Sequence, residues 1–108
     1  MSAGLGVGVV GLGAWGEVHV QAWQSLPLIQ VTAVCSRDAA RARDIAERFG
    51  VPRCCATPEE LAADHDVDIV SVVNHERDHL RATLAAVDRR KPVLVESRLR
   101  LPWRKLAR

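Results

Sequence analysis

The sequence predicts an α/β domain in which a doubly wound parallel sheet carries helices on both faces. Two observations predict this fold class. Short, mostly apolar runs alternate along the chain with longer segments of helical spacing, and residues typical of helix starts and ends stand between them. With 108 residues, the chain has the length of a single domain.

The first half of the chain has the pattern strand, helix, strand, helix. We expect a strand over residues 5–11, a helix over 14–26, a strand over 30–35 and a helix from 38 to about 49. In the first helix, Val18, Ala22 and Leu26 share one face, which we expect to be buried. Asp38 is a suitable N-cap for the second helix, and Gly50 stands where a left-handed C-cap belongs.

The second half repeats the alternation. We expect a short strand within residues 51–56, a helix beginning at 57–60, a strand over 68–73, a helix over 76–90 and a strand over 93–95. Thr57 is the expected cap of the first of these helices, with Pro58 in its first turn. In the second, Leu80, Leu84 and Val87 are expected to face the core.

A glycine motif stands between the first strand and the first helix. The run GLGAWG fits G-x-G-x-x-G, with Ala14 and Trp15 between the last two glycines. Gly11 permits the tight turn, Gly13 lets a pyrophosphate approach the backbone, and Gly16 lets the helix pack closely on the strand. The N–H groups of the helix start then face the phosphates. The motif predicts a dinucleotide site; the alternative is a glycine turn with no ligand.

Gly4, Gly6 and Gly8 form a second G-x-G pattern slightly earlier in the chain. Gly6 and Gly8 lie within the expected strand and not after it. We therefore interpret them as positions of close packing.

The end of the second strand bears on which dinucleotide binds. An acid there would accept a hydrogen bond from the free 2′-hydroxyl of NAD, but the chain has Ser36 followed by Arg37. A hydroxyl and a guanidinium favour the 2′-phosphate of NADP. NAD stays open, because Arg37 could be a solvated loop residue and Asp38 could reach the ribose as well as cap a helix.

Charge is distributed unevenly along the chain. The sequence holds 15 Lys and Arg and 13 Asp and Glu. Five of the basic residues lie in residues 97–108, which leaves ten against all thirteen acids in residues 1–96. The body is therefore mildly acidic, which argues against a nucleic-acid groove.

The cysteines and the hydropathy indicate a compartment. Cys35, Cys54 and Cys55 have neither metal-binding spacing nor a disulfide framework, which fits a reducing cytoplasm. No signal peptide and no apolar run of membrane-spanning length is present in these 108 residues. We therefore expect a cytoplasmic protein without a metal site or a membrane partner.

Four segments resemble a known family: VGVVGLGAWGEVH, VTAVCSRDAARARDIAERFGV, TPEELAADHDVDIVSVV and ATLAAVDRRKPVLVE. Over about residues 6–96 they are similar to the N-terminal NAD(P)-binding domain of the Gfo/Idh/MocA oxidoreductases, the relatives of glucose–fructose oxidoreductase and inositol dehydrogenase. The more specific features are His19, three residues past Gly16, the ERFGV helix ending and the KPVLVE strand.

The resemblance implies a Rossmann-like domain over residues 1–96 that binds NAD or NADP. In such proteins hydride moves to or from sugars, polyols and related molecules, and a second α/β domain supplies most of the substrate site and the oligomer contacts. That domain is not within these 108 residues. The substrate and the oligomeric state therefore stay open.

The chain departs from the family pattern in two places. The family usually has T-P-x-x-x-H after the fourth strand; here Asn74 and His75 replace Thr-Pro, while His79 matches the histidine. We expect these three residues near the nicotinamide side. Glu96 ends the fifth strand, and we expect it to belong to the cofactor site. After it, the family has Lys-Pro, but this chain has Ser97-Arg98. The resemblance therefore gives no catalytic residue.

Residues 97–108, SRLRLPWRKLAR, form a basic tail unlike the family. A permitted set of codons for this tail, shifted by one inserted base, translates to KPLALTLEEARE, which restores E-K-P. One interpretation is a one-base deletion after Glu96. The other is an amphipathic helix with Leu99, Trp103 and Leu106, which docks on a partner.

Three functions follow from these patterns. The first is the cofactor domain of an NAD(P)-dependent oxidoreductase, without turnover in this chain. The second is a non-catalytic nucleotide-binding or interaction module whose basic tail docks on a partner. The third is a different Rossmann-type binder, such as a CoA-ligase nucleotide domain.

Overall fold

The computed structural model describes residues 4–73 and 76–95 of the chain. Its elements alternate throughout, in the order β1 (Leu5–Val10), α1 (Ala14–Gln24), β2 (Ile29–Cys35), α2 (Ala39–Phe49), β3 (Arg53–Cys55), α3 (Pro58–Ala63), β4 (Ile69–Val72), α4 (Glu76–Asp88) and β5 (Val93–Val95). The predicted order of strands and helices is confirmed, with ends that differ by at most two residues. In the part described, no helix is long and apolar enough to cross a membrane.

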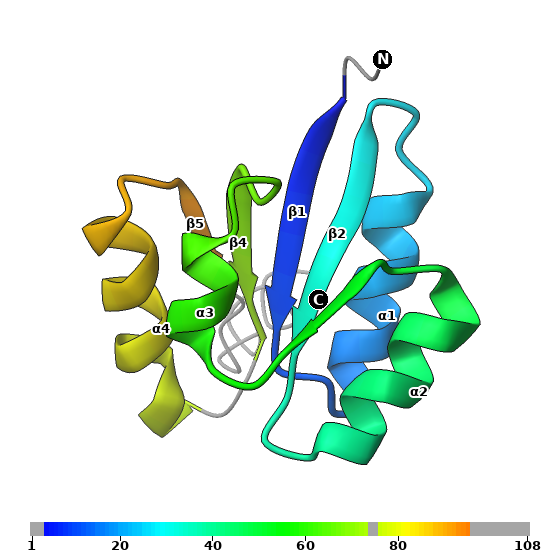
Figure 1. The fold of residues 1–108 in the computed structure, drawn as a ribbon, viewed down its shortest axis with the longest axis horizontal. Coiled ribbons are helices and arrows are strands. Elements are labelled where there is room, and N and C mark those ends of the chain that lie inside the picture. The colour runs from blue at the N-terminus through cyan, green and yellow to red at the C-terminus, as the bar shows by residue number, and fades with distance from the viewer. Residues whose placement is uncertain (1–3, 74–75, 96–108) are drawn as a thin grey trace, which may run out of the picture.

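The five strands form one parallel sheet in the order β3-β2-β1-β4-β5. From β1, the chain first winds outward through β2 and β3 and then crosses to β4 on the other side (Figure 1). This is a doubly wound sheet, as predicted. Its direction of winding changes between β1 and β4, and in such sheets ligands bind outside the carboxyl ends of the strands at this point.

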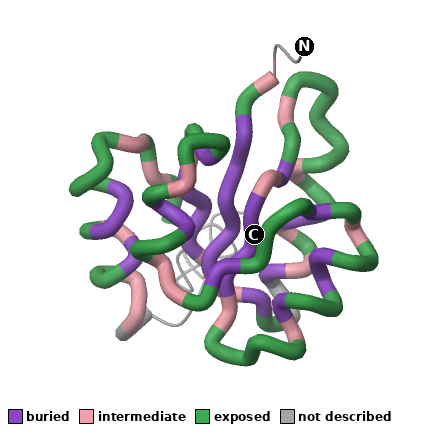
Figure 2. The backbone as a smooth tube through the Cα atoms, in the orientation of Figure 1, coloured by how far each residue is buried: buried purple, intermediate pink, exposed green. Residues whose placement is uncertain are grey.

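Two layers of helices cover the sheet. Helices α1 and α2 lie on one side of it, and α3 and α4 lie on the other (Figure 1). Each layer has its own apolar core, one built around Val20 and Ile45 and the other around Leu61 and Ala86. The central strand β1 is buried along all of its length except Leu5, which explains why its sequence shows no polar alternation (Figure 2).

The helix boundaries follow the capping residues. The Asp38 carboxylate accepts hydrogen bonds from the N–H groups of Ala40 and Arg41 at the start of α2. Gly50 ends that helix in the left-handed region, at a φ of 69°. Thr57 accepts a hydrogen bond from the Glu60 N–H at the start of α3. These local predictions are confirmed, because caps depend only on residues within one turn.

The buried faces predicted for α1 and α4 are wrong. Val18 is 49% exposed, and Leu80, Leu84 and Val87 are each more than half exposed. The buried face of α4 instead consists of alanines, including Ala82.

In α1 the inward face carries Gly16 and Val20, which are both buried, whereas Ala22 and Leu26 are exposed. Gly16 must contact the loop that precedes the helix, and this contact fixes the rotation of the helix about its axis. Small residues likewise let α4 approach the sheet closely. The most hydrophobic face was therefore not the one that packed.

Gly6 and Gly8 are close-packing positions, as predicted. A Cβ at Gly6 would lie 1.9 Å from the Asp66 carbonyl oxygen, and one at Gly8 would lie 2.6 Å from Leu61 Cδ2. Their absent side chains therefore make room for the chain before β4 and for α3.

Candidate cofactor site

The glycine loop connects the carboxyl end of β1 to the start of α1. Gly11 has a φ of 99°, a region that side chains disfavour, and its N–H donates a 2.8 Å hydrogen bond to the Cys35 carbonyl oxygen at the end of β2. A Cβ at Gly16 would lie 2.2 Å from the Gly11 carbonyl oxygen. At Gly13 an added Cβ would meet nothing within 4 Å. The first and third glycines thus hold the loop together, while the second borders open space.

Helix α1 begins without the side-chain cap that α2 and α3 have. Its N-cap is Gly13, whose carbonyl oxygen accepts hydrogen bonds from the N–H groups of Gly16 at 3.0 Å and Glu17 at 3.3 Å. The N–H groups of Ala14 and Trp15 belong to the first turn, which an α-helix leaves without intrahelical acceptors. Such an N-terminus, beside an exposed glycine, suits an anion such as a phosphate.

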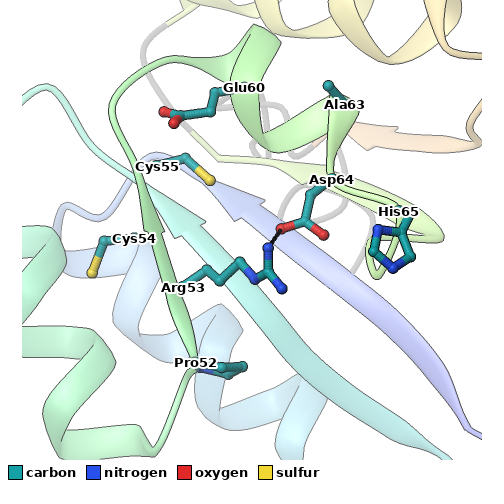
Figure 3. A pocket seen from close by; sticks show the side chains of 8 residues that line it. All are labelled: Pro52, Arg53, Cys54, Cys55, Glu60, Ala63, Asp64 and His65. Carbon is teal, nitrogen blue, oxygen red and sulfur yellow. Dashed lines mark ion pairs between the residues drawn. The ribbon is translucent and has the colours of Figure 1, made fainter.

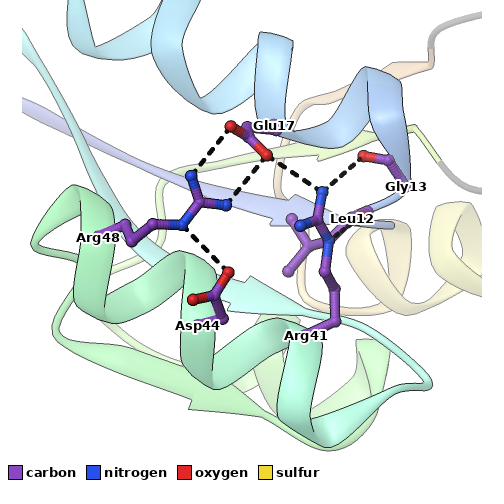
Figure 4. A network of polar contacts seen from close by, with 6 residues as sticks. All are labelled: Leu12, Gly13, Glu17, Arg41, Asp44 and Arg48. Atoms are coloured by element: carbon purple, nitrogen blue, oxygen red, sulfur yellow. Dashed lines mark hydrogen bonds and ion pairs between the residues drawn. The ribbon is translucent and has the colours of Figure 1, made fainter.

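An arginine from α2 holds this loop from outside. Arg41 Nε donates a 2.7 Å hydrogen bond to the Leu12 carbonyl oxygen, and Arg41 Nη2 lies 3.5 Å from the Gly13 carbonyl oxygen (Figure 4). The same Nη2 lies 3.2 Å from Glu17 Oε1 in α1. Arg48 also contacts Glu17, at 3.1 and 3.2 Å (Figure 4). The loop carbonyls are thereby fixed, which orients the N–H groups on the other side of the same peptides.

These contacts change the acidity of their members. Hydrogen bonding from Arg48 lowers the pKa of Glu17, assisted by the charges of Arg48 and Arg41 and opposed by partial burial. Hydrogen bonds to Glu17 and Asp44 raise the pKa of Arg48. No pattern in the sequence predicted this network. The contact between Arg48 and Glu17 joins residues that are 31 positions apart in the sequence, and no local pattern marks that pairing.

A small cleft of about 80 Å³ lies at the carboxyl ends of β1 and β2. It is lined by Val10, Gly11, Cys35, Ser36, Arg37, Ala56, Pro58, Asp78 and Arg81. The structure therefore brings the first glycine of the loop together with the Ser36-Arg37 pair that the sequence singled out. This is the position at which folds of this type contact the ribose of the adenosine half of a dinucleotide.

The side chains around Ser36 are mostly engaged. Ser36 Oγ accepts a 3.1 Å hydrogen bond from the Asp38 N–H, and Asp38 Oδ1 accepts both hydrogen bonds that cap α2. Arg37 is largely exposed but forms an ion pair with Asp78 of α4. The sequence did not predict a role for Asp78, because no family position or spacing marks this residue.

The remaining predicted site residues come from the segment after β4 and the end of β5. His79 lies near the start of α4 and is half-buried. Asn74, His75 and Glu96 lie outside the described residues. Their proximity to a cofactor stays a prediction, as does that of His79.

Two wider surface hollows lie elsewhere. One, of about 560 Å³, borders the edge strand β3 and the end of α3, where Arg53 forms an ion pair with Asp64 at 3.2 Å (Figure 3). The other, of about 570 Å³, lies along the amino-terminal part of β2. Neither includes a residue of the glycine loop. Within residues 4–73 and 76–95, no group of three or more His, Cys, Asp or Glu is placed to hold a metal ion.

The strand order and the glycine loop that opens α1 at the end of the central strand define a Rossmann-type nucleotide-binding domain. The family model described as "Oxidoreductase family, NAD-binding Rossmann fold" matches residues 5–104. The chain belongs to this family, the Gfo/Idh/MocA oxidoreductases, and the resemblance stated from the sequence is confirmed.

Individual relatives cover most of this chain but a minor part of their own length. Inositol 2-dehydrogenase of Acidothermus cellulolyticus is 36% identical over 94 residues, which are 86% of this chain and 28% of that protein. Trans-1,2-dihydrobenzene-1,2-diol dehydrogenase of Danio rerio is 39% identical over 70 residues, or 65% of this chain and 21% of that protein. The chain thus spans less than a third of these two relatives.

Solved structures agree. GenD2 from gentamicin A biosynthesis, in complex with NAD, is 34% identical with a TM-score of 0.82, over 90% of this chain and 28% of that one. The myo-inositol dehydrogenase of Lactobacillus casei, in complex with NAD(H) and myo-inositol, is 27% identical with a TM-score of 0.82, over 97% of this chain and 34% of that one. The predicted fold class is confirmed.

Proposed function

We propose that this chain is a dinucleotide-binding domain that seats the pyrophosphate of NAD or NADP on the N-terminus of α1. The observation that carries the proposal is the start of α1 at Gly13, which has no side-chain cap. Helices α2 and α3, in contrast, each have one. Two further features support it: Arg41 holds the glycine loop by its carbonyls, and the cleft lined by Ser36 and Arg37 includes Gly11 of the same loop. Neighbours of this fold contain NAD(H).

In a full-length enzyme, the activity that fits this domain is hydride transfer with a sugar or polyol, as in the inositol dehydrogenases to which the chain is similar. For residues 1–108 alone we propose cofactor binding without turnover. The family resemblance implies a lysine near the nicotinamide after Glu96, and Ser97 stands there instead. A serine hydroxyl does not carry the proton that an ammonium group does.

The choice between the two cofactors depends on the small cleft lined by Ser36, Arg37 and Asp78, which we call the ribose cleft. Arg37 next to Ser36 favours the 2′-phosphate of NADP, because a guanidinium forms strong charge-assisted hydrogen bonds with phosphate oxygens. The NAD(H) in the neighbours belongs to those proteins, and we propose the NADP preference for this chain on the basis of its own residues.

Fluorescence titration of the chain with NADH and NADPH tests the proposal. The Gly13→Val substitution should weaken both by more than about tenfold, because its side chain enters the space next to the phosphate loop. Gln21→Val, at an exposed position of the same helix, is the matched control and should bind normally. Circular dichroism should show both variants folded, since Gly13 borders open space.

Two results would contradict the proposal. If the unmutated chain binds neither dinucleotide, the site is not a cofactor site. If the purified chain oxidises a polyol with NAD(P) at a steady rate, binding without turnover is wrong.

A further inference from the structure

The ribose cleft contains two arginines that reach it from different elements, and both are paired with acids. Arg37, after β2, pairs with Asp78 of α4, which lies 41 positions further along the chain. Arg81 of α4 donates hydrogen bonds of 2.9 and 2.8 Å to the two carboxylate oxygens of Glu59 in α3. The cleft therefore presents its positive charges already compensated.

The two partners of the Arg37 pair differ in exposure. The Arg37 side chain is 76% exposed and extends from a loop, whereas the Asp78 side chain is 29% exposed on a helix. The carboxylate is thus the more fixed member. A 2′-phosphate that enters the cleft meets this carboxylate and must share or displace the guanidinium.

We propose that Asp78 determines how strongly this site prefers NADP, because its carboxylate competes with the 2′-phosphate for Arg37. The proposal rests on the proposed function and deepens it. A 2′-phosphate carries up to two negative charges and needs a cation that is free to turn towards it. A 2′-hydroxyl has no such need and can donate a hydrogen bond to a carboxylate. Asp78 therefore acts from the opposite wall of the cleft like the acid that Ser36 replaces at the end of β2.

The test compares NADPH and NADH affinity in the 108-residue chain. Asp78→Asn keeps the shape of the side chain but removes the charge that holds Arg37, so the ratio of NADPH to NADH affinity should rise by about tenfold, the size of one charge-assisted hydrogen bond. Asp88→Asn, at the other end of the same helix, makes the same change in net charge away from the cleft. That control should leave the ratio unchanged.

A double-mutant cycle separates competition for Arg37 from simple repulsion. In the Arg37→Gln background, Asp78→Asn should change the ratio much less than it does in the unmutated chain. An equal change in both backgrounds would overturn the proposal, because Asp78 would then act by its charge alone. An unchanged ratio in Asp78→Asn, with both dinucleotides still bound, would also overturn it and leave the proposed function intact. If the unmutated chain binds neither NADH nor NADPH, the proposed function is refuted instead.

Discussion

The two halves of this sheet pack their helices in different ways. On the α1 and α2 side, large side chains such as Val20 and Ile45 fill the core, and ion pairs cover the outside. On the α3 and α4 side, helix α4 contributes alanines such as Ala82 and Ala86 to the core, while Leu80 and Leu84 are exposed. Both halves also leave apolar side chains exposed, such as Val18 and Leu26 on the α1 side, so the two halves differ in which side chains fill the core.

The two edge strands of the sheet also differ in polarity. Edge strand β3 carries Arg53, which forms ion pairs with Asp64 and Asp66, and charge of this kind protects an edge from pairing with other strands. Edge strand β5 has Leu94 at 51% exposed and Val95 at 39%. The β3 edge is thus protected by charge, whereas the β5 edge leaves apolar area exposed to water. Such area is a liability for aggregation.

The largest expected effect distinguishes the buried face of α2 from the exposed face of α4. Ile45→Ala should lower the free energy of unfolding by about 2–5 kcal/mol, because Ile45 is fully buried and its removal leaves a cavity. Leu84→Ala, on the exposed face of α4, should change it by less than about 0.5 kcal/mol. Urea denaturation of both variants measures the difference. Similar losses would show that α4 buries its leucines after all.

A smaller effect is expected within the glycine loop that precedes α1. Gly16→Ala should cost about 1–3 kcal/mol of unfolding free energy, because its Cβ would overlap the Gly11 carbonyl oxygen. Gly13→Ala should leave thermal stability nearly unchanged, since nothing lies within 4 Å of an added Cβ. Thermal melts followed by circular dichroism distinguish the two. A strongly destabilised Gly13→Ala would mean that the loop is closed at that residue.

Of the two apolar cores, only the one on the α3 and α4 side should make stability depend on alkaline pH. That core includes Cys35 and Cys55, whereas the core cluster beside α1 and α2 contains no titratable side chain. Burial raises the pKa of Cys35 from 9.0 to about 12 and that of Cys55 to about 11, with a smaller contribution from neighbouring charge. The folded state therefore holds protons that the unfolded state releases. Stability is complete below about pH 9 and falls as the pH rises towards 11–12.

Denaturation curves between pH 7 and 11 test this prediction. The unmutated chain should lose stability in the alkaline part of the range, and a Cys35→Ala, Cys55→Ala variant should lose less over the same interval. Parallel pH profiles for the two proteins would assign the loss to other groups.

The smallest effect concerns one glutamate in each half. Arg48 lowers the pKa of Glu17 beside the glycine loop, and Arg81 lowers that of Glu59 on the other side of the sheet, in both cases chiefly by hydrogen bonding. Arg48→Gln should raise the pKa of Glu17 towards its ordinary value and leave that of Glu59 where it is. Carboxyl NMR titration measures both. A joint shift would show that the two halves are coupled.

How far prediction from the sequence reached depended on the range of the interactions involved. The order of strands and helices, the caps at Asp38 and Thr57 and the left-handed Gly50 were all predictable, because each depends on residues a few positions apart. So was the placement of the glycine loop between β1 and α1. The inward faces of α1 and α4 were not, since close contacts of small residues, and not the largest apolar residues, set the rotation of those helices.

By itself the sequence determined an alternating α/β chain whose glycines stand at the end of its first strand. Only the tertiary structure brought Arg41 onto the loop carbonyls and Asp78 onto Arg37, across 29 and 41 positions. The physical reason is that strand order decides which strand ends and helix starts share an edge of the sheet. Pairings of charge across that edge leave no periodic trace along the chain.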